Sequence, residues 1–487
     1  MRGRILIIFS LLFLLAGALV WKVSSMEELT GHQDLIVAPD DYLDTHLTTI
    51  WEKLIFRINA QPFNILTLAI FLAAICHVFL ANSIHRYATG QLAQARKEGR
   101  AEFGWEVLKL FGEIEVIFGV WVIPLLLAMI YFYGQQFALN YLQGLEFFEP
   151  IFVVVIMAIA STLPIMTAAA NVLKTVTHLG GSSLLTQWIV LLALGPLLGS
   201  FLTEPGAMTI TALLLAREFY SRKPSPTLAY ATLGLLFVNV SVGGVLTHFA
   251  APPVLMVANK WGWSTSFMLT NFGYKAILGI VVSVALYAVL FWKEFKSMQK
   301  QTIHKGKEEE SKVPLWVILT HLAFLAAVVI YEHYPVVFIG IFLFFLAFHQ
   351  ATRKYQESLH IKQPILVGCF LAGLVIHGGL QGWWVAPLIE GAHGGVLMVL
   401  AATLSAFVDN AGITYLTTLV PNFESGLKYA VVAGAVIGGG MTVIGNAPNP
   451  VGQSILSKNF PGGVSPAKLA LAAITPTLIM LAAFYFL

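Results

Sequence analysis

Two carboxylates interrupt long apolar stretches of this sequence. Asp409 lies near the middle of Gly394–Val420, and Glu204 occupies the corresponding place in Trp188–Ala216. If these stretches enter a membrane, an ionised carboxylate costs about 2.5–3.5 kcal/mol there, so such residues usually have a functional role. Either carboxylate could bind a cation or exchange a proton.

Polar side chains without a fixed charge gather at the same interruptions and in two further apolar stretches. They are Thr203, Asn239, Thr247, His248, Asn410, Thr442, Asn446 and Asn449. As a set they predict a site for a hard cation, which prefers oxygen ligands. Each amide or hydroxyl could instead form a hydrogen bond between helices. His248 could shuttle protons near neutral pH, or it could be a buried histidine with satisfied nitrogens.

The two carboxylates also have structural interpretations. Asp409 could cap a short helix that follows a hairpin turn. Glu204 could sit at a tip that approaches the cytoplasmic water, and Pro205 suits the first turn of a helix.

The composition predicts a membrane-embedded helical protein. Of the 487 residues, 57% are hydrophobic and 11% are charged, whereas soluble domains are about 25% charged. The apolar runs are roughly twenty residues long, which is the length of membrane-spanning helices. The net charge of +3 and the absence of a basic cluster interleaved with aromatic residues do not suggest nucleic-acid binding. Cys76 and Cys369 lie in apolar runs and are interpreted as core residues.

About ten membrane spans are predicted besides an amino-terminal helix and two interrupted stretches. The expected segments are Ile5–Trp21, Pro62–Ala81, Leu110–Tyr133, Pro150–Val172, Trp188–Ala216 (interrupted), Leu228–Ala258, Asn271–Trp292, Pro314–Tyr331, Pro335–Phe348, Pro364–Leu380, Gly394–Val420 (interrupted), Tyr429–Leu456 and Ala467–Leu487. Ile5–Trp21 follows Arg2 and Arg4, and reads as a retained signal anchor in preference to a cleaved signal peptide.

Basic residues collect in four loops, within residues 86–100, 217–223, 293–312 and 353–362. All four lie on the cytoplasmic side only if Trp188–Ala216 enters the membrane and returns without crossing it. A second such hairpin at Gly394–Val420 places Lys458 and Lys468 on that side and Lys428 outside. The expected orientation is multi-pass in the inner membrane, with a cytoplasmic amino terminus and an external carboxyl terminus.

The order of spans and hairpins before residue 293 recurs, inverted, after residue 313. The predicted fold is an all-α polytopic membrane protein of two inverted-topology repeats, each with a re-entrant hairpin and a broken transmembrane helix. The expected parts are residues 1–60 (amino-terminal helix and external segment), 61–292 (first repeat), 293–313 (cytoplasmic linker) and 314–487 (second repeat).

Matching residues support this repeat. Phe201 and Gly206 correspond to Phe407 and Gly412 at an offset of 206 (407 − 201). The next spans match at an offset of 196 (439 − 243), which pairs Gly243-Gly244 with Gly439-Gly440 and Ala251-Pro252 with Ala447-Pro448.

Glycine and proline in these stretches predict interrupted helices. The expected backbone breaks are at Gly206, Gly243, Gly244, Pro252, Gly412, Gly439, Gly440 and Pro448. Unpaired backbone groups survive in a bilayer only when they are buried in protein or face a wet cavity, so breaks indicate a binding site.

Two segments resemble a known family. Ser405–Asn410 and Gly438–Asn449 are similar to the second hairpin and broken helix of sodium/proton antiporters in the ion transporter superfamily, which are relatives of arsenite permeases and divalent anion/sodium symporters. Thr203-Glu204-Pro205, Gly243-Gly244 and Ala251-Pro252 occupy the corresponding first-half positions. These antiporters tend to carry Asp-Asn in both hairpins, whereas the first tip here is Thr203-Glu204.

The resemblance implies a secondary transporter and not an enzyme, with no cofactor. It implies ion sites at the hairpin tips and breaks, an elevator-type alternating-access mechanism and a homodimer. We predict exchange of Na⁺ for H⁺, with Na⁺ at Asp409, Asn410, Thr442 and Asn446, because a cation and a proton compete for one carboxylate. The alternative is sodium-coupled uptake of a small carboxylate or other anion. The four interrupted segments contain no Lys or Arg to bind such an anion. A third possibility is an intramembrane enzyme, but the sequence contains no His-Glu-x-x-His stretch that would indicate one.

Overall fold

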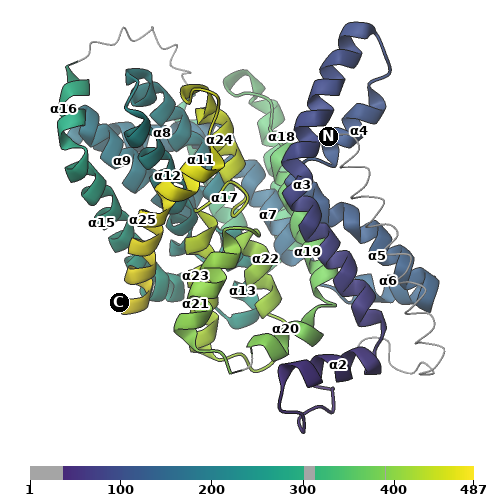
Figure 1. The fold of residues 1–487 in the computed structure, drawn as a ribbon. Coiled ribbons are helices and arrows are strands. Elements are labelled where there is room, and N and C mark those ends of the chain that lie inside the picture. Colours follow the sequence, from purple (N-terminus) through teal and green to yellow (C-terminus); the bar gives the residue numbers. More distant parts are fainter. Residues whose placement is uncertain (1–36, 301–312, 390) are drawn as a thin grey trace. The chain divides into compact units, whose positions relative to one another are not determined.

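The computed structural model describes residues 37–300, 313–389 and 391–487, and it shows helices joined by turns and loops (Figure 1). The predicted helix Ile5–Trp21 lies outside the described residues. The chain forms two compact units that interleave in sequence. Unit 1 comprises Met1–Pro150, Ile365–Ala392 and Tyr415–Phe423, and unit 2 comprises Ile151–Pro364, His393–Thr414 and Glu424–Leu487.

Most expected spans coincide with helices. The α-helices are α2 (Ile50–Ala60), α3 (Phe63–Glu98), α4 (Phe103–Leu110), α5 (Ile117–Tyr133), α6 (Gln135–Gln143), α7 (Phe148–Ala160), α8 (Leu163–Leu179), α9 (Leu184–Leu197), α10 (Gly199–Leu202), α11 (Glu204–Glu218), α12 (Pro226–Gly243), α13 (Pro252–Trp261), α14 (Thr265–Met268), α15 (Tyr274–Leu290), α16 (Trp292–Gln299), α17 (Leu315–Ile330), α18 (Pro335–Ala351), α19 (Lys362–Gly378), α20 (Gly382–Ile389), α21 (Gly394–Ser405), α22 (Asn410–Thr417), α23 (Ser425–Gly439), α24 (Asn449–Leu456) and α25 (Pro466–Phe486).

Among the described residues, five helical segments are long and apolar enough to cross a membrane, and seven spans result if each of two bent helix pairs counts as one. Five further apolar helices, such as α9 and α21, are 10–17 residues long. The prediction of about ten spans therefore exceeds the number of full-length helices. The difference arises because several expected spans are short or divided.

Several local expectations were wrong. Pro150–Val172 is divided into α7 and α8, because Thr162 has an extended backbone and Pro164 begins the next helix. The segment between the expected spans Leu110–Tyr133 and Pro150–Val172 contains α6. Cys76 and Cys369 are exposed on helix surfaces and are not core residues.

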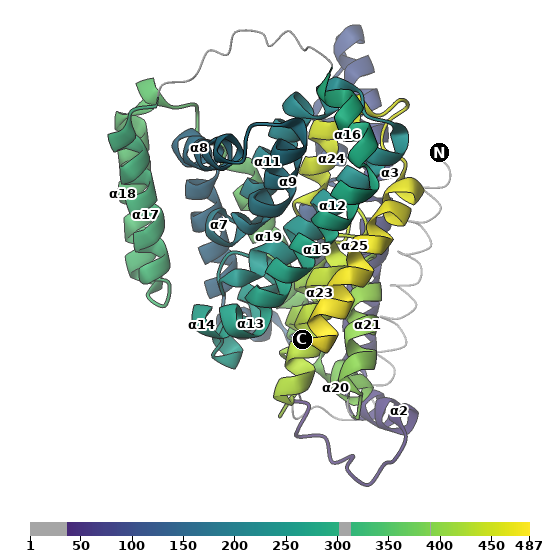
Figure 2. The same ribbon diagram turned by 90° about the vertical axis from the view of Figure 1, so that its left-hand side faces the viewer.

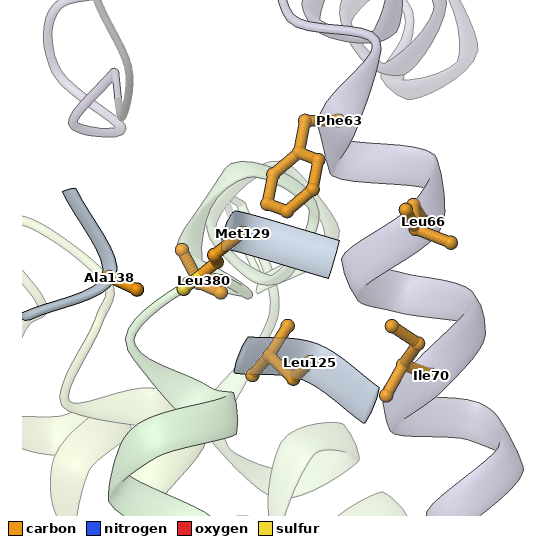
Figure 3. Packing of buried hydrophobic residues seen from close by; sticks show 7 residues of the cluster. All are labelled: Phe63, Leu66, Ile70, Leu125, Met129, Ala138 and Leu380. Carbon is orange, nitrogen blue, oxygen red and sulfur yellow. The ribbon is translucent and has the colours of Figure 1, made fainter. Parts of the chain in front are cut away.

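An apolar cluster holds the first helices of unit 1 together (Figure 3). Phe63 and Ile70 of α3 pack with Leu125 and Met129 of α5, and all four are buried. Outside this cluster Arg57 forms a buried ion pair with Asp44, with 2.6 Å between Nε and Oδ2.

Unit 2 is organised around α12, which is buried along almost its whole length. It packs against α9, α15, α23 and α25, and Figure 2 shows α12, α15 and α25 as neighbouring helices. Small residues allow close approach: a Cβ at Gly234 would lie 2.8 Å from the backbone of Ala472 in α25. This packing places the helix ends around Gly244 and Gly439 inside the unit.

Candidate ion-binding site

The first tip combines a strained residue with an enclosed carboxylate. Thr203 links α10 to α11 with φ 68° and ψ 152°, a region that is almost exclusive to glycine. Glu204 follows as the first residue of α11 and is completely buried. Strain at a buried non-glycine residue beside a buried carboxylate is typical of functional sites.

The Glu204 carboxylate is only half satisfied by protein groups. Asn446 Nδ2 donates a hydrogen bond to Glu204 Oε2 over 2.8 Å. Oε1 is buried and has no hydrogen-bond partner among the described residues. A Cβ at position 244 would lie 2.8 Å from Oε1, so Gly244 leaves the space that the carboxylate occupies. A buried anionic oxygen without a donor favours a cation or a proton.

Asn446 connects this carboxylate to the carboxyl-terminal end of α12. Its Nδ2 also donates to Ser241 Oγ over 3.2 Å, and Ser241 Oγ donates to the carbonyl of Val436 over 2.6 Å. Asn446 Oδ1 is buried and has no partner among the described residues. The amide therefore presents one acceptor oxygen beside Glu204. The sequence analysis missed Ser241, although it is a polar residue in an apolar run.

The second tip holds Asp409 in a different way. Asp409 precedes α22, is half-buried, and accepts a hydrogen bond from the backbone N–H of Ala411 over 2.9 Å. This is the capping interaction that the sequence left as an alternative. The carboxylates of Asp409 and Glu204 are close enough for their charges to interact.

Asn410 is buried behind this cap. Its backbone N–H donates to the carbonyl of Gly445 over 3.2 Å. Both side-chain amide atoms are buried without a partner in the described part of the chain, and a Cβ at Gly439 would lie 2.8 Å from Asn410 Nδ2. Asn410 Oδ1 is thus a further oxygen available at the breaks, as is Asn449 Oδ1, which is also buried without a partner among the described residues.

Most of the other expected ligands bond to backbone carbonyls. Asn239 donates to Leu192, Thr247 to Ser200, Thr442 to Ala406, and Asn449 to both Gly439 and Thr442, over 2.6–2.9 Å. These bonds connect hairpins with helix breaks, or the two sides of one break. They satisfy carbonyls that interrupted helices leave unpaired.

Six of the eight glycine and proline residues expected at breaks lie at helix ends, and the two at the tips do not. Gly243 and Gly439 end α12 and α23, Gly244 and Gly440 follow them, and Pro252 and Pro448 stand at the start of α13 and α24. Gly206 and Gly412 lie inside the first turns of α11 and α22. The tips therefore break earlier, at Thr203 and before Asn410.

Comparison with known families identifies the family of this chain. Residues 62–487 match the family described as "Putative Na+/H+ antiporter". The chain belongs to this antiporter family. No curated protein matches the chain. Membership and the apolar helices together establish a multi-pass membrane protein of a transporter family.

In this antiporter-family chain, the histidine of the first break forms its hydrogen bonds with residues other than Glu204. His248 Nδ1 lies 2.6 Å from Thr265 Oγ1, and Nε2 is hydrogen-bonded to Glu332 Oε1. Glu332 is buried. His377 is also completely buried, and its Nε2 lies 3.2 Å from the carbonyl oxygen of Phe118.

Proposed function

We propose that this protein exchanges Na⁺ for H⁺ and that Glu204 is the carboxylate at which the two ions compete. The observation that carries the proposal is Glu204 Oε1, a buried carboxylate oxygen with no partner among the described residues. An ionised carboxylate is costly in such surroundings unless a cation neutralises it, and protonation removes the charge instead. Occupancy by Na⁺ and occupancy by H⁺ therefore exclude each other.

Neutral oxygens beside Glu204 would complete the cation site. Asn446 Oδ1 and Asn410 Oδ1 are buried acceptors, and the carboxylate and amide oxygens are the hard ligands that such a cation prefers. Thr442, which the sequence placed among the Na⁺ ligands, donates its hydroxyl to the carbonyl of Ala406, and its hydroxyl oxygen keeps the lone pairs that a cation ligand needs.

Asp409 has a secondary role in this proposal. Asp409 is half-buried and can be reached by solvent, whereas Glu204 is completely buried, so neutralisation by an ion matters more at Glu204. Its negative charge near Glu204 raises the attraction of the site for Na⁺. The centre of exchange thus moves from Asp409, where the sequence placed it, to the first tip.

Recurring contacts support two related halves. A Cβ at Gly243 would lie 2.6 Å from the carbonyl oxygen of Pro196, and one at Gly438 would lie 1.9 Å from that of Ala402. The hairpin residues differ by 206 (402 − 196) and the helix residues by 195 (438 − 243).

The same two offsets relate further pairs of contacts. Thr247 donates to Ser200 as Thr442 donates to Ala406. Gly244 lies against Glu204 as Gly439 lies against Asn410. These pairs favour a register of 195 in the helices before the breaks, one residue from the offset read from the sequence.

Ser241 and Val436 are equivalent to each other under this register (436 − 241), and they are in contact. In a two-fold arrangement, equivalent residues meet only near the axis. The contact therefore supports the proposal of inverted repeats covering residues 61–292 and 314–487, with re-entrant hairpins at α9–α11 and α21–α22.

Alternating access would then carry a single site between the two sides of the membrane. We infer an elevator-type movement within a homodimer in the inner membrane, with the amino terminus cytoplasmic and the carboxyl terminus external. These inferences rest on family resemblance and on the distribution of basic loops.

Proteoliposomes with an acidic lumen and a trapped pH-sensitive dye test the proposal. Added Na⁺ should raise the lumenal pH, because each Na⁺ that enters releases protons, and Li⁺ and K⁺ define the preference. Succinate or citrate should neither be required nor accelerate the response. A response that requires added succinate or citrate would favour anion symport. The absence of a response to any cation would refute the proposal.

A further inference from the structure

Glu332 is a buried carboxylate outside the ion site. It lies in the turn between α17 and α18, and its side chain is 8% exposed. Two histidines contact it: His248 is hydrogen-bonded to Oε1, and the Nε2 of His333, whose side chain is 66% exposed, lies 3.7 Å from the same oxygen. A buried carboxylate of this kind is maintained only where its partner compensates the cost of desolvation.

His248 uses both ring nitrogens in this arrangement. Nε2 meets Glu332, and Nδ1 meets the Thr265 hydroxyl at the start of α14. Glu332 thereby sets the orientation of the ring, as carboxylates do for histidines in many sites. The ring is held from two directions, so it fixes the loop that carries it.

That loop leads directly to the first tip. Thr247, adjacent to His248, donates to the carbonyl of Ser200 over 2.7 Å, and Leu246 N–H donates to Ser200 Oγ over 2.9 Å. Ser200 Oγ in turn donates to the carbonyl of Gly243 over 2.7 Å. Ser200 belongs to α10, the short helix that ends at the strained residue before Glu204.

We propose that Glu332 is a positioning residue for ion exchange: through His248 it holds the first helix break, and through Ser200 the tip that carries Glu204. The inference rests on the proposed function, because its readout is the affinity for Na⁺. Loss of the contact lets the break and the tip shift together, so Glu204 and Asn446 meet the cation less well. The turnover of occupied sites changes less than the apparent affinity.

A double-mutant cycle measured in proteoliposomes tests this proposal. Glu332→Ala and His248→Ala should each raise the apparent KM for Na⁺ about tenfold, and the double variant should raise it no further, because both remove the same contact. Glu332→Gln keeps an acceptor for the imidazole N–H and should restore the KM to within about threefold of wild type. His333→Ala removes the exposed neighbour and should leave the KM unchanged.

The outcomes separate this inference from the proposed function. Additive effects of the two alanine variants, or Glu332→Gln as impaired as Glu332→Ala, would overturn the positioning role while wild-type exchange remains. A wild-type KM in Glu332→Ala would overturn it equally. Wild-type protein without Na⁺-driven proton release would refute the proposed function and this role with it. If an alanine variant does not fold, the Glu332→Leu and His248→Phe pair, which removes the contact but keeps most of the side-chain volume, supplies the same cycle.

Discussion

Replacing Gly244 by alanine should displace the Glu204 carboxylate without straining the backbone. Gly244 has φ −78° and ψ −9°, which any residue adopts, so only space requires glycine here. The added Cβ would lie 2.8 Å from Glu204 Oε1, whereas ordinary contacts begin near 3.4 Å, so the carboxylate must withdraw by about 0.6 Å. The neighbouring Ala251 Cβ, at 3.2 Å, restricts movement of the new methyl group.

The magnitude follows from how sensitive a preorganised site is to position. Since a misplacement of about 1 Å can cost roughly a hundredfold in rate, 0.6 Å should lower the Na⁺ efficiency of exchange about tenfold, or about 1.4 kcal/mol. The assay is dye-reported proton release at a series of Na⁺ concentrations. Gly340→Ala in α18 is the matched control, because its Cβ would meet nothing within 4 Å. Gly244→Ala with efficiency within twofold of wild type would refute this placement of Glu204.

Three further substitutions test separate parts of the structure. Thr203→Gly should unfold at a higher temperature than Thr203→Ala, by the equivalent of about 1 kcal/mol, because glycine adopts φ 68° without strain and alanine does not. The reverse order of melting temperatures would show that the backbone at residue 203 is not strained. Asp409→Asn should keep its helix cap, its melting temperature and Na⁺/H⁺ exchange, and its apparent affinity for Na⁺ should be several-fold weaker. Complete loss of exchange in this variant would return the central role to Asp409. Asp44→Ala removes the carboxylate that pairs with the buried Arg57, so scanning fluorimetry should show destabilisation of about 3–5 kcal/mol. An unchanged melting temperature would contradict a structural role for the ion pair.

The sequence predicted the helix breaks well because their cause is local. Gly243-Gly244 and Gly439-Gly440 interrupt apolar runs, and the structure ends α12 and α23 there. Local signals were less reliable at the tips, where Thr203 adopts a backbone conformation that its residue type disfavours. The sequence did not predict the break at Thr162, because the apolar run Pro150–Val172 is long enough for one span. Pro164, in the first turn of α8, was the local signal for a new helix.

The enclosure of the site could not be read from the sequence. Asp409 and Glu204 occupy similar places in their apolar runs, and only the fold places Asn446, 242 residues further on, against Glu204. The same holds for His248 and Glu332, which are 84 residues apart. A periodic pattern identifies the face of a helix but does not identify the distant side chain that it meets. The inverted repeat stays a prediction that recurring contacts support.

Glu204→Gln provides the most direct measurement of the central claim. Glutamine keeps the size of the side chain and can still pair with Asn446, but it can neither carry the negative charge nor exchange a proton. Proton release and ²²Na⁺ uptake should be followed in the same proteoliposomes, with Glu204→Asp as a variant that keeps the carboxylate. Loss of both fluxes in Glu204→Gln, with a normal melting temperature and residual exchange in Glu204→Asp, is the predicted result. Coupled exchange at the wild-type rate in Glu204→Gln would contradict the account.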